Sequence, residues 1–293
     1  MYSIFFCLGL IFIGIVAGFA SGLLGVGGGF IIVPLQYFLL NSSGINSDLA
    51  MIVSIATSLA IIIPTALSGA YRHQKLNKDI IRPGIILGIS GIIGSFIGGQ
   101  IAIFIPVNIL QIIFAIVLIG VAINMIVDAF KSNKDNSVND DNQNSLNDNC
   151  DNLIENNNSK LNFNLTTAIL MGSLVGVLSG LLGVGGGVFM IPILTILFGF
   201  KLKKAIGTSS VFISLTAIGG FLSYSISSTV INPIPYSIGY ISLINWFLII
   251  LFSVPMASIG AKYVYKIPDK TLKLVFSVLI LFMAIKLLGI SPI

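Results

Sequence analysis

Charge and reactive side chains are scarce in this sequence. Asp, Glu, Lys and Arg make up 9% of its 293 residues, whereas soluble globular proteins carry about 25%. It has 1 histidine and 2 cysteines, Cys7 and Cys150, too few for a disulfide framework or a histidine-rich metal motif. The histidine, His73, falls in a basic loop, which argues against a Ser-His pair. Hydrophobic residues reach 56%, and the mean hydropathy is +1.04. The composition therefore excludes an ordinary soluble enzyme, a disordered chain and a nucleic-acid-binding protein.

The apolar residues are gathered into segments long enough to cross a bilayer, which takes about 20 residues as a helix. These segments lie at 4–40, 46–70, 83–104, 107–129, 164–200, 205–228, 237–265 and 270–290. The main interruption is 131–162, an asparagine-rich tract with too little apolar surface to fold. We predict an all-α integral membrane protein with two transmembrane halves, 1–130 and 163–293, joined by a polar cytoplasmic linker at 131–162.

The two halves are copies of one another. Residues 14–34 and 172–192 both contain S-G-L-L-G-V-G-G-G followed by a proline, and the next segment of each half holds a Thr-Ser pair. The third segments end in Ile97-Gly98 and Ile259-Gly260, each shortly before a proline. Because the landmarks keep the same order, they indicate an internal duplication rather than a shared composition.

Lysines and arginines indicate that the copies are inverted. They cluster at 72–82 in the first half and at 201–204 and 262–273 in the second, which are not equivalent loops. Short cytoplasmic loops are enriched in Lys and Arg, so the halves are predicted to face opposite ways across the membrane. Inversion requires the first segment of each half to cross an even number of times. We therefore predict about ten spans, or six spans plus two re-entrant hairpins, with both termini outside and the linker inside.

The first segment of each half is broken by Gly-Val-Gly-Gly-Gly, and these breaks are the candidate binding site. Irregular backbone at membrane depth is tolerated only inside protein or beside a cavity. A helix that starts after a break directs N–H groups and its positive dipole end toward an anion. The candidate residues are Gly27, Gly28, Gly29, Gly185, Gly186 and Gly187. The alternative is close helix packing, which we assign to the stripe Gly14, Gly18, Gly22 and its copy Gly172, Gly176, Gly180.

The Thr-Ser pairs add four candidate hydroxyls, Thr57, Ser58, Thr208 and Ser209, as donors to the same anion. The alternative is that each hydroxyl bonds back to its own i−4 carbonyl. Ser21 and Ser179 also repeat, but their spacing places them on the packing stripe. The histidine, His73, is assigned to a basic cytoplasmic loop, and Asn245-Trp246, which occurs once, suits an interfacial anchor.

The duplicated G-x-x-S-G-L-L-G-V-G-G-G-x-x-x-x-P, each copy followed by a helix with A-T-S or G-T-S, resembles the sulfite exporter TauE/SafE family. The resemblance covers both halves and excludes the linker. It implies a multipass plasma-membrane permease for sulfur-containing anions such as sulfite or sulfonates. Ala56 replaces the glycine that Gly207 keeps, so strict equivalence of the halves is not expected.

We therefore predict a transporter rather than an enzyme, located in the plasma (inner) membrane, with an alternating-access anion site at the midplane where the two breaks approach each other. Its expected partners are a small anionic substrate and the lipid bilayer, with no cofactor, no metal and no nucleic acid. The sequence leaves the oligomeric state open. Two alternatives also stay open: a membrane-embedded scaffold or assembly protein, which a dry, fully packed midplane would favour, and an anion channel. Under the transporter reading, Gly28→Leu and Gly186→Leu should block transport while leaving a folded protein, whereas Gly176→Ala should lower stability.

Overall fold

The computed structural model describes residues 4–74, 80–135, 164–200, 202–227 and 236–263, and the short pieces 277–278, 281–282 and 284–285. In chain order the elements are α1 (Ile4–Leu24), α2 (Gly29–Ser42), α3 (Ser47–Gln74), α4 (Ile81–Phe104), α5 (Val107–Asp135), α7 (Leu165–Leu182), α8 (Gly187–Pro192), the π-helical turn η3 (Ile193–Leu197), α9 (Leu202–Ile226), β1 (Ser237–Ile238), β2 (Ile241–Ser242) and α10 (Leu243–Tyr263). The predicted linker from 136 onward, most of the predicted segment 270–290, and the charged positions at 75–79, 201 and 264–273 lie outside the described residues.

Six helices in these described ranges are long and apolar enough to cross a membrane: α1, α3, α4, α7, α9 over Lys204–Ile226, and α10. Their outer faces are apolar, as α4 illustrates with Ile85, Ile89, Ile93, Ile97 and Ile101, which are 40% to 63% exposed. Exposed isoleucine outside and buried serine and threonine inside are what a lipid environment favours. The prediction of an all-α membrane protein is confirmed, except that the predicted segment 237–265 begins as a two-stranded antiparallel hairpin, β1–β2.

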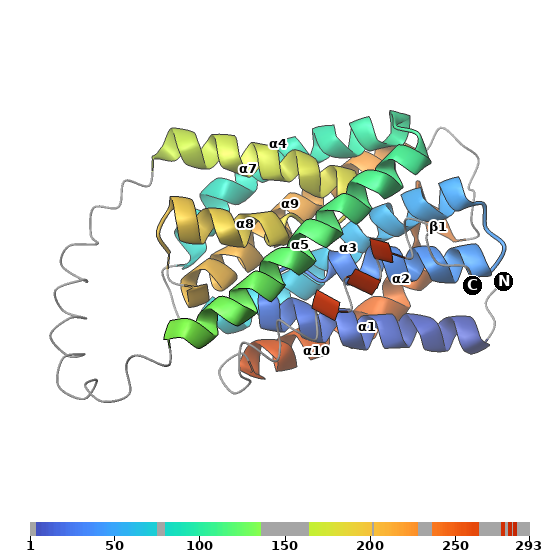
Figure 1. The fold of residues 1–293 in the computed structure, drawn as a ribbon. Coiled ribbons are helices and arrows are strands. Elements are labelled where there is room, and N and C mark those ends of the chain that lie inside the picture. The colour runs from blue at the N-terminus through green and yellow to red at the C-terminus, as the bar shows by residue number, and fades with distance from the viewer. Residues whose placement is uncertain are drawn as a thin grey trace, which may run out of the picture.

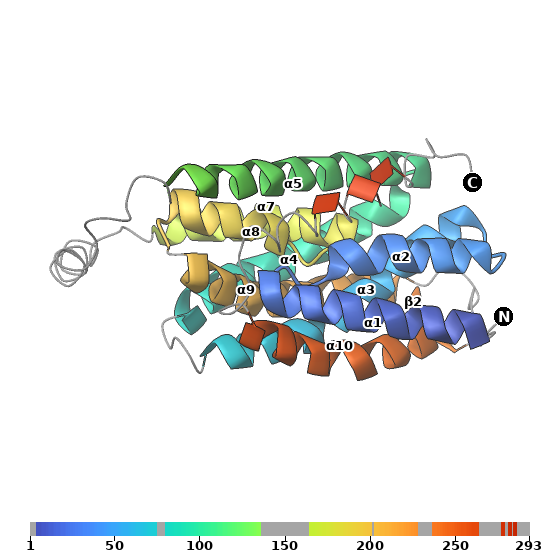
Figure 2. The same ribbon diagram turned by 60° about the horizontal axis from the view of Figure 1, so that its bottom comes forward.

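Each first segment is broken into two helices that lie on either side of a glycine-rich turn. The turn at 25–28 separates α1 from α2, and the turn at 183–186 separates α7 from α8. The pair α1 and α2 folds back as an antiparallel hairpin, because Gly9 faces Leu39 while Gly28 faces Ala17. Figure 1 shows α2 and α8 extending from the centre of the molecule toward opposite ends. In the view of Figure 2, α5 runs along one edge of the bundle and α10 along the other.

One group of parallel helices consists of α1, α3 and α10. Along α1 and α10 the facing pairs are Gly14 with Ile249, Gly18 with Ser253, and Gly22 with Ala257. Along α3 and α10 the hydrogen-bonded pairs are Thr57 with Ser242, Ala60 with Trp246, and Thr65 with Ser253. Residue numbers rise together in both series, so the three helices run in the same direction.

The second group of parallel helices consists of α4, α7 and α9. Along α7 and α4 the facing pairs are Gly172 with Leu87, Gly176 with Gly91, and Gly180 with Ser95; along α4 and α9 they are Gly84 with Val211, Gly88 with Leu215, and Gly99 with Ser223. The groups meet where α3 packs on α9. There Leu59 contacts Gly220, while Ile62 lies at the level of Ile213, so α3 and α9 run antiparallel.

The two glycine stripes are packing surfaces, as their spacing predicts. A methyl group at Gly18 would lie 2.4 to 2.8 Å from backbone atoms of Ser253 on α10, the carbonyl oxygen being the nearest. A methyl group at Gly176 would lie 2.5 Å from the carbonyl oxygen of Gly91 on α4. Only glycine lets these backbones approach so closely. The same contact occurs twice, between α1 and α10 and between α7 and α4.

Candidate functional site

The two breaks have the same backbone conformation. In the first, Gly25, Gly27 and Gly28 have φ of 63, 84 and 74°; in the second, Gly183, Gly185 and Gly186 have φ of 68, 81 and 76°. Left-handed values of this kind cost a residue with a side chain roughly 1–2 kcal/mol each. The end of each preceding helix is closed by a backbone bond, from Gly25 N to Ser21 O and from Gly183 N to Ser179 O, both 2.9 Å long. The glycines therefore build a specific double turn rather than a flexible gap.

The two turns touch one another, as the sequence predicts. A methyl group at Gly29 would lie 2.5 Å from the carbonyl oxygen of Gly183, and one at Gly187 would lie 3.1 Å from the carbonyl oxygen of Gly25. All five residues of each turn, 25–29 and 183–187, are buried. The candidate residues Gly27, Gly28, Gly29, Gly185, Gly186 and Gly187 thus form one continuous structure that joins the two halves.

Two isoleucines that the sequence reasoning missed close the space between the turns. Gly27 and Gly185 each face both Ile62 of α3 and Ile213 of α9, and both isoleucine side chains are fully buried. Ile62 follows Ser58 by four residues, as Ile213 follows Ser209. The repeat therefore carries a signal for this pair, but an isoleucine in an apolar span attracts no attention by itself.

Ser58 and Ser209 hold the turns of the opposite halves. Ser58 Oγ on α3 donates to the carbonyl oxygen of Gly183 at 2.6 Å, and Ser209 Oγ on α9 donates to the carbonyl oxygen of Gly25 at 3.0 Å. Ser58 Oγ also lies 2.8 Å from its own i−3 carbonyl, Ile55 O. Each serine thereby satisfies the carbonyl at the end of a broken helix, a group that the helix leaves unpaired.

The two threonines beside these serines differ from each other. Thr57 Oγ1 accepts a hydrogen bond from the backbone N–H of Ser242 at 3.1 Å. Thr208 Oγ1 is completely buried and has no hydrogen-bond partner. A buried hydroxyl without a partner loses about 1–3 kcal/mol relative to one that is bonded. Thr208 is therefore the candidate hydroxyl that remains available to a ligand in this conformation.

Backbone N–H groups also remain available where α2 and α8 begin. Ile31 N and Ile32 N both donate to Gly28 O at 3.0 Å. The equivalent donors on α8, Phe189 N and Met190 N, bond to Gly186 O at 3.2 and 3.0 Å. Helix geometry provides no carbonyl for the N–H groups that come before them, those of Gly29 and Phe30 on α2 and of Gly187 and Val188 on α8. The carbonyls of Gly25 and Gly183 are thus bonded to serines, while the first N–H groups of α2 and α8 have no intrahelical carbonyl. Helix starts of this kind are the ends of the helix dipole that favour negative charge.

Two assignments made from the sequence are corrected by the structure. Ser21 and Ser179 belong to the packing stripe by spacing, yet their side chains lie against Gly28 and Gly186 at the turns, and Ser179 Oγ is buried without a partner. His73 lies not in a loop but in the last turn of α3, where it is buried against the backbone of Gly22. Its counterpart Tyr224 donates to Gly180 O at 3.0 Å. Helix packing rather than local charge decides both placements.

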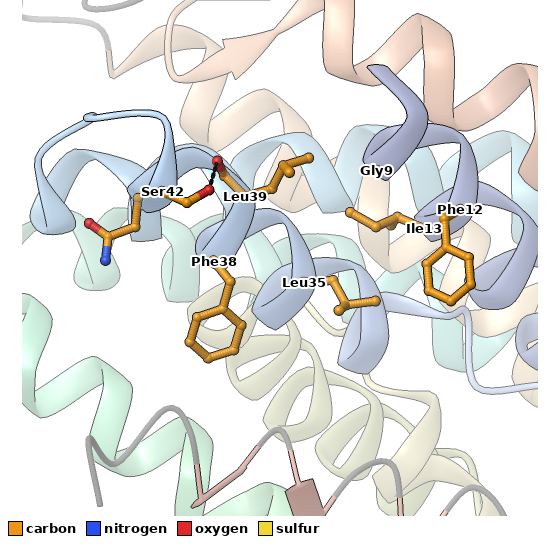
Figure 3. A pocket seen from close by; sticks show the side chains of 8 residues that line it. Gly9, Phe12, Ile13, Leu35, Phe38, Leu39 and Ser42 are labelled. Carbon is orange, nitrogen blue, oxygen red and sulfur yellow. Dashed lines mark hydrogen bonds between the residues drawn. The ribbon is translucent and has the colours of Figure 1, made fainter. Parts of the chain in front are cut away.

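An apolar groove of about 480 Å³ lies between α1 and α2, away from the turns. Figure 3 shows its lining side chains, among them Phe12, Leu35 and Phe38. No cluster of three His, Cys, Asp or Glu side chains able to hold a metal occurs among the residues that the structure describes. The polar groups described at the turns are backbone N–H and carbonyl groups and the hydroxyls of Ser58, Ser209 and Ser179.

Comparison with known proteins finds relatives that match almost the whole chain. The family described as sulfite exporter TauE/SafE matches residues 10–287. A probable membrane transporter protein of Haemophilus influenzae is 31% identical over 290 residues, covering 96% of this chain and 98% of that protein. One from Methanocaldococcus jannaschii is 30% identical over 269 residues, covering 92% and 90%, and one from Bacillus subtilis is 29% identical over 283 residues, covering 95% and 96%. No solved structure gives a significant match.

Proposed function

Since the chain belongs to the sulfite exporter TauE/SafE family of membrane transporters, we propose that it carries small sulfur-containing anions, such as sulfite or sulfonates, through a site between its two glycine turns. The chain is a multi-pass protein of the plasma membrane. The observation that carries the proposal is the direct contact of the two turns, each of which is followed by a helix whose first N–H groups have no intrahelical carbonyl.

The chemistry of the site matches an anion that has to leave water. An unpaired ionised group in an apolar interior is very costly, so a transport site must replace the hydration shell. Four N–H groups, those of Gly29, Phe30, Gly187 and Val188, would supply donors without a buried cation. Thr208 Oγ1, which is unpaired on α9 beside Ser209, is proposed as a fifth donor. A site of dipoles and hydroxyls binds an anion less tightly than a lysine or arginine would, which suits release on the other side.

Within this proposal the four predicted hydroxyls have different roles. Thr208 is a ligand, because its hydroxyl is buried and free of other bonds. Ser58 and Ser209 are positioning residues, because their hydroxyls are bonded to the carbonyls of Gly183 and Gly25. By holding those carbonyls, the serines keep the partial negative charge at the ends of α1 and α7 away from the anion. Thr57 supports the start of α10 through Ser242.

The two halves are proposed to be inverted repeats that exchange access to the site. Helix directions support this: α1 and α3 of the first half run parallel to α10 of the second, α7 and α9 run parallel to α4, and α3 is antiparallel to α9. Exchanging the halves therefore exchanges the groups and reverses their direction. In alternating access, the two turns would separate on one face at a time, while the stripes on α1 and α7 keep each broken helix attached to its partner.

One observation favours the rival function of a membrane-embedded scaffold, namely the tight contact between the turns. A scaffold needs no route for a substrate, and Ile62 and Ile213 fill the space between Gly27 and Gly185. A transporter in its closed conformation has the same appearance. Membership in a family of membrane transporters favours the closed transporter over the scaffold. A transport measurement distinguishes these two functions.

The deciding experiment is reconstitution of the full chain into liposomes with a panel of ³⁵S-labelled sulfite, sulfate and methanesulfonate. We expect saturable uptake of at least one of these anions, accelerated by the same unlabelled anion on the far side. Non-saturating flux without counterflow would indicate a channel. No flux of any of the anions in vesicles that hold correctly folded protein would refute the proposed substrate class and favour the scaffold.

The inverted topology is tested by cysteine labelling with a membrane-impermeant reagent on intact cells. Cys150 lies in the linker and Cys7 near the N-terminus, so two single-cysteine variants retain one native thiol each. We expect protection of Cys150 until the membrane is permeabilised, and labelling of cysteines added at both chain ends without permeabilisation. Labelling at only one end would contradict an even number of crossings by the broken segments.

A further inference from the structure

The start of α10 is buried, although α10 is one of the long membrane helices. The β1–β2 hairpin that precedes α10 leads from the surface into the interior within a few residues. Tyr236 is 74% exposed, whereas Ser242 and Asn245 are completely buried. Ser242 lies beside Thr57, in the interior of α3, and its N–H donates to Thr57 Oγ1. The positive end of the α10 dipole is therefore inside the protein, with no acidic residue in the first turn of the helix.

Three polar atoms at this helix start have no hydrogen-bond partner. They are Ser242 Oγ, Asn245 Nδ2 and Asn245 Oδ1. A serine directly before a helix normally accepts a bond from an N–H of the first turn, but Ser242 Oγ makes none. Ser242 and Asn245 are three residues apart, so they lie on the same face of the first turn. Native proteins rarely leave buried amides and hydroxyls unpaired, and an ordered water or a bound ligand usually accounts for such groups.

A third unpaired group lies in the same layer. Gln36 of α2 is fully buried, and both polar atoms of its amide lack a partner. The depth of Gln36 along the bundle, relative to Asn245, follows from the residues that α1 faces. Leu39 of α2 faces Gly9, and Ile249 of α10 faces Gly14. Counting along each helix places both Gln36 and Asn245 near residues 10–12 of α1. They are therefore within about one helical turn of one another in depth.

We propose that the buried start of α10, with Ser242 and Asn245, is a second anion-binding site, on the side of the glycine turns that the predicted topology places outside. The ligand class is a small oxyanion, because the available groups are an amide NH₂, a hydroxyl and the first-turn N–H groups of Ile244 and Asn245 at a positive helix end. The N–H of Leu243 is not among them, since it donates to Tyr236 O at 3.0 Å. This inference rests on the proposed function, since it takes the anion class of the central site.

The adjacent residues Thr57 and Ser58 connect the second site to the central one. Thr57 accepts the N–H of Ser242 at the start of α10, while Ser58 donates to Gly183 O in the second turn. A shift of α3 that separates the turns therefore also moves the start of α10. The first half has no such site: aligned on Ile97-Gly98 and Ile259-Gly260, the positions of Ser242 and Asn245 correspond to Ile80 and Pro83.

The chain contains a single tryptophan, Trp246, placed next to Asn245 with its Nε1 donating to Ala60 O at 3.2 Å. Its fluorescence therefore reports on the α10 start directly. The experiment titrates the purified full chain in micelles with sodium sulfite, sodium sulfate and sodium methanesulfonate, with sodium chloride at matched ionic strength as the reference. We expect a saturable fluorescence change for at least one oxyanion.

Asn245→Leu and Ser242→Ala should each raise the half-saturating concentration at least about tenfold, as loss of a hydrogen bond to a charged ligand does. Their thermal stability should be unchanged or higher, because each removes an unpaired buried group. The matched controls are Asn108→Leu, at an exposed position, and Ser173→Ala, at a half-buried one, which remove the same groups from α5 and α7. Both should titrate like the unmodified chain. If Asn245→Leu fails to fold, Ser242→Ala decides the question alone.

The same preparations, placed in liposomes with the ³⁵S-labelled anions, separate this inference from the proposed function. A variant-sensitive fluorescence change without transport of any anion would refute the proposed function and support the second site. Normal transport combined with no saturable change, or with folded variants that titrate like the unmodified chain, would overturn the second site and leave the proposed function intact.

Discussion

Thr208 and Ser209 are neighbours on α9, yet we expect their substitution to have opposite consequences. Ser209→Ala removes the hydroxyl that donates to Gly25 O at 3.0 Å. Thr208→Val replaces a hydroxyl that has no partner with a methyl group of the same shape. The first change should lower stability with little effect on substrate affinity. The second should weaken substrate binding without lowering stability.

The expected magnitudes follow from burial. Ser209→Ala leaves a buried carbonyl without its partner, which costs roughly 1–3 kcal/mol in proteins generally. Side-chain bonds between membrane helices average only about 0.6 kcal/mol, with a maximum near 1.7, so we expect a loss of about 1–2 kcal/mol. Thr208→Val removes an unsatisfied group and should be neutral or slightly stabilising. A lost hydroxyl-to-anion bond of roughly 1.5–3 kcal/mol weakens apparent affinity at least about tenfold.

Two measurements on each variant test the contrast. The free energy of unfolding is obtained from denaturant titration in micelles followed by circular dichroism, and the KM for labelled anion from liposome uptake. Ser58→Ala, which releases Gly183 O in the opposite turn, serves as the counterpart of Ser209→Ala and should behave like it. The reasoning fails if Thr208→Val destabilises the protein as much as Ser209→Ala, or if Ser209→Ala raises KM tenfold at unchanged stability.

Two further predictions concern glycines. Gly176→Ala should lower the yield of folded protein, because its methyl group would lie 2.5 Å from a carbonyl oxygen of α4. Gly69→Ala, whose methyl group would have nothing within 4 Å, should be neutral or stabilising. Equal thermal stability of the two variants would contradict close packing of the stripe. Gly186→Leu should also reduce the amount of folded protein, contrary to the expectation from the sequence, because Gly186 has a φ of 76° and its Cβ would lie close to Val175. Gly44→Ala is the control for backbone strain alone, since Gly44 has a φ of 86° and open space around it. Folded yields by size-exclusion chromatography distinguish these cases, and a well-folded Gly186→Leu variant would show that the turn tolerates a side chain.

The glycine turns could be predicted from the sequence because their signal is local and occurs twice. A Gly-Val-Gly-Gly-Gly break in a long apolar segment has few structural solutions, and the duplication implies that the two solutions are alike. The left-handed glycines and the contact between the turns follow from that pattern. The packing stripes could be predicted for the same reason, since a four-residue glycine period describes a single helix face.

The hydroxyl partners could not be predicted, because they depend on helix rotation and on distant residues. The back-bonding alternative is correct for Ser54, Thr65 and Thr216, which donate to their own i−4 carbonyls. Ser58 and Ser209 instead donate to carbonyls 125 and 184 residues away. Asn245, which the sequence assigns with Trp246 to an interfacial anchor, is instead completely buried. Asn245 and Ser242 have no counterparts in the first half, and reasoning from the repeat selects what occurs in both halves.

Some features occur in both halves and others in one half only. We infer that the repeated ones support the conformational change and the unrepeated ones bind the ligand. The features that repeat at the centre of the molecule are the two turns, Ser58 with Ser209, and Ile62 with Ile213, and these hold the turns together. Such contacts have to be equivalent if each half is to open in turn by the same movement. Hydrogen-bond donors are distributed unequally, since Thr208 is free where Thr57 is bonded, and Asn245 stands where the first half has a proline. If the halves were identical, both faces would bind the anion equally. We therefore expect any difference in apparent affinity between the faces to depend on Thr208, Ser242 and Asn245, and to persist in variants of the repeated serines that still fold.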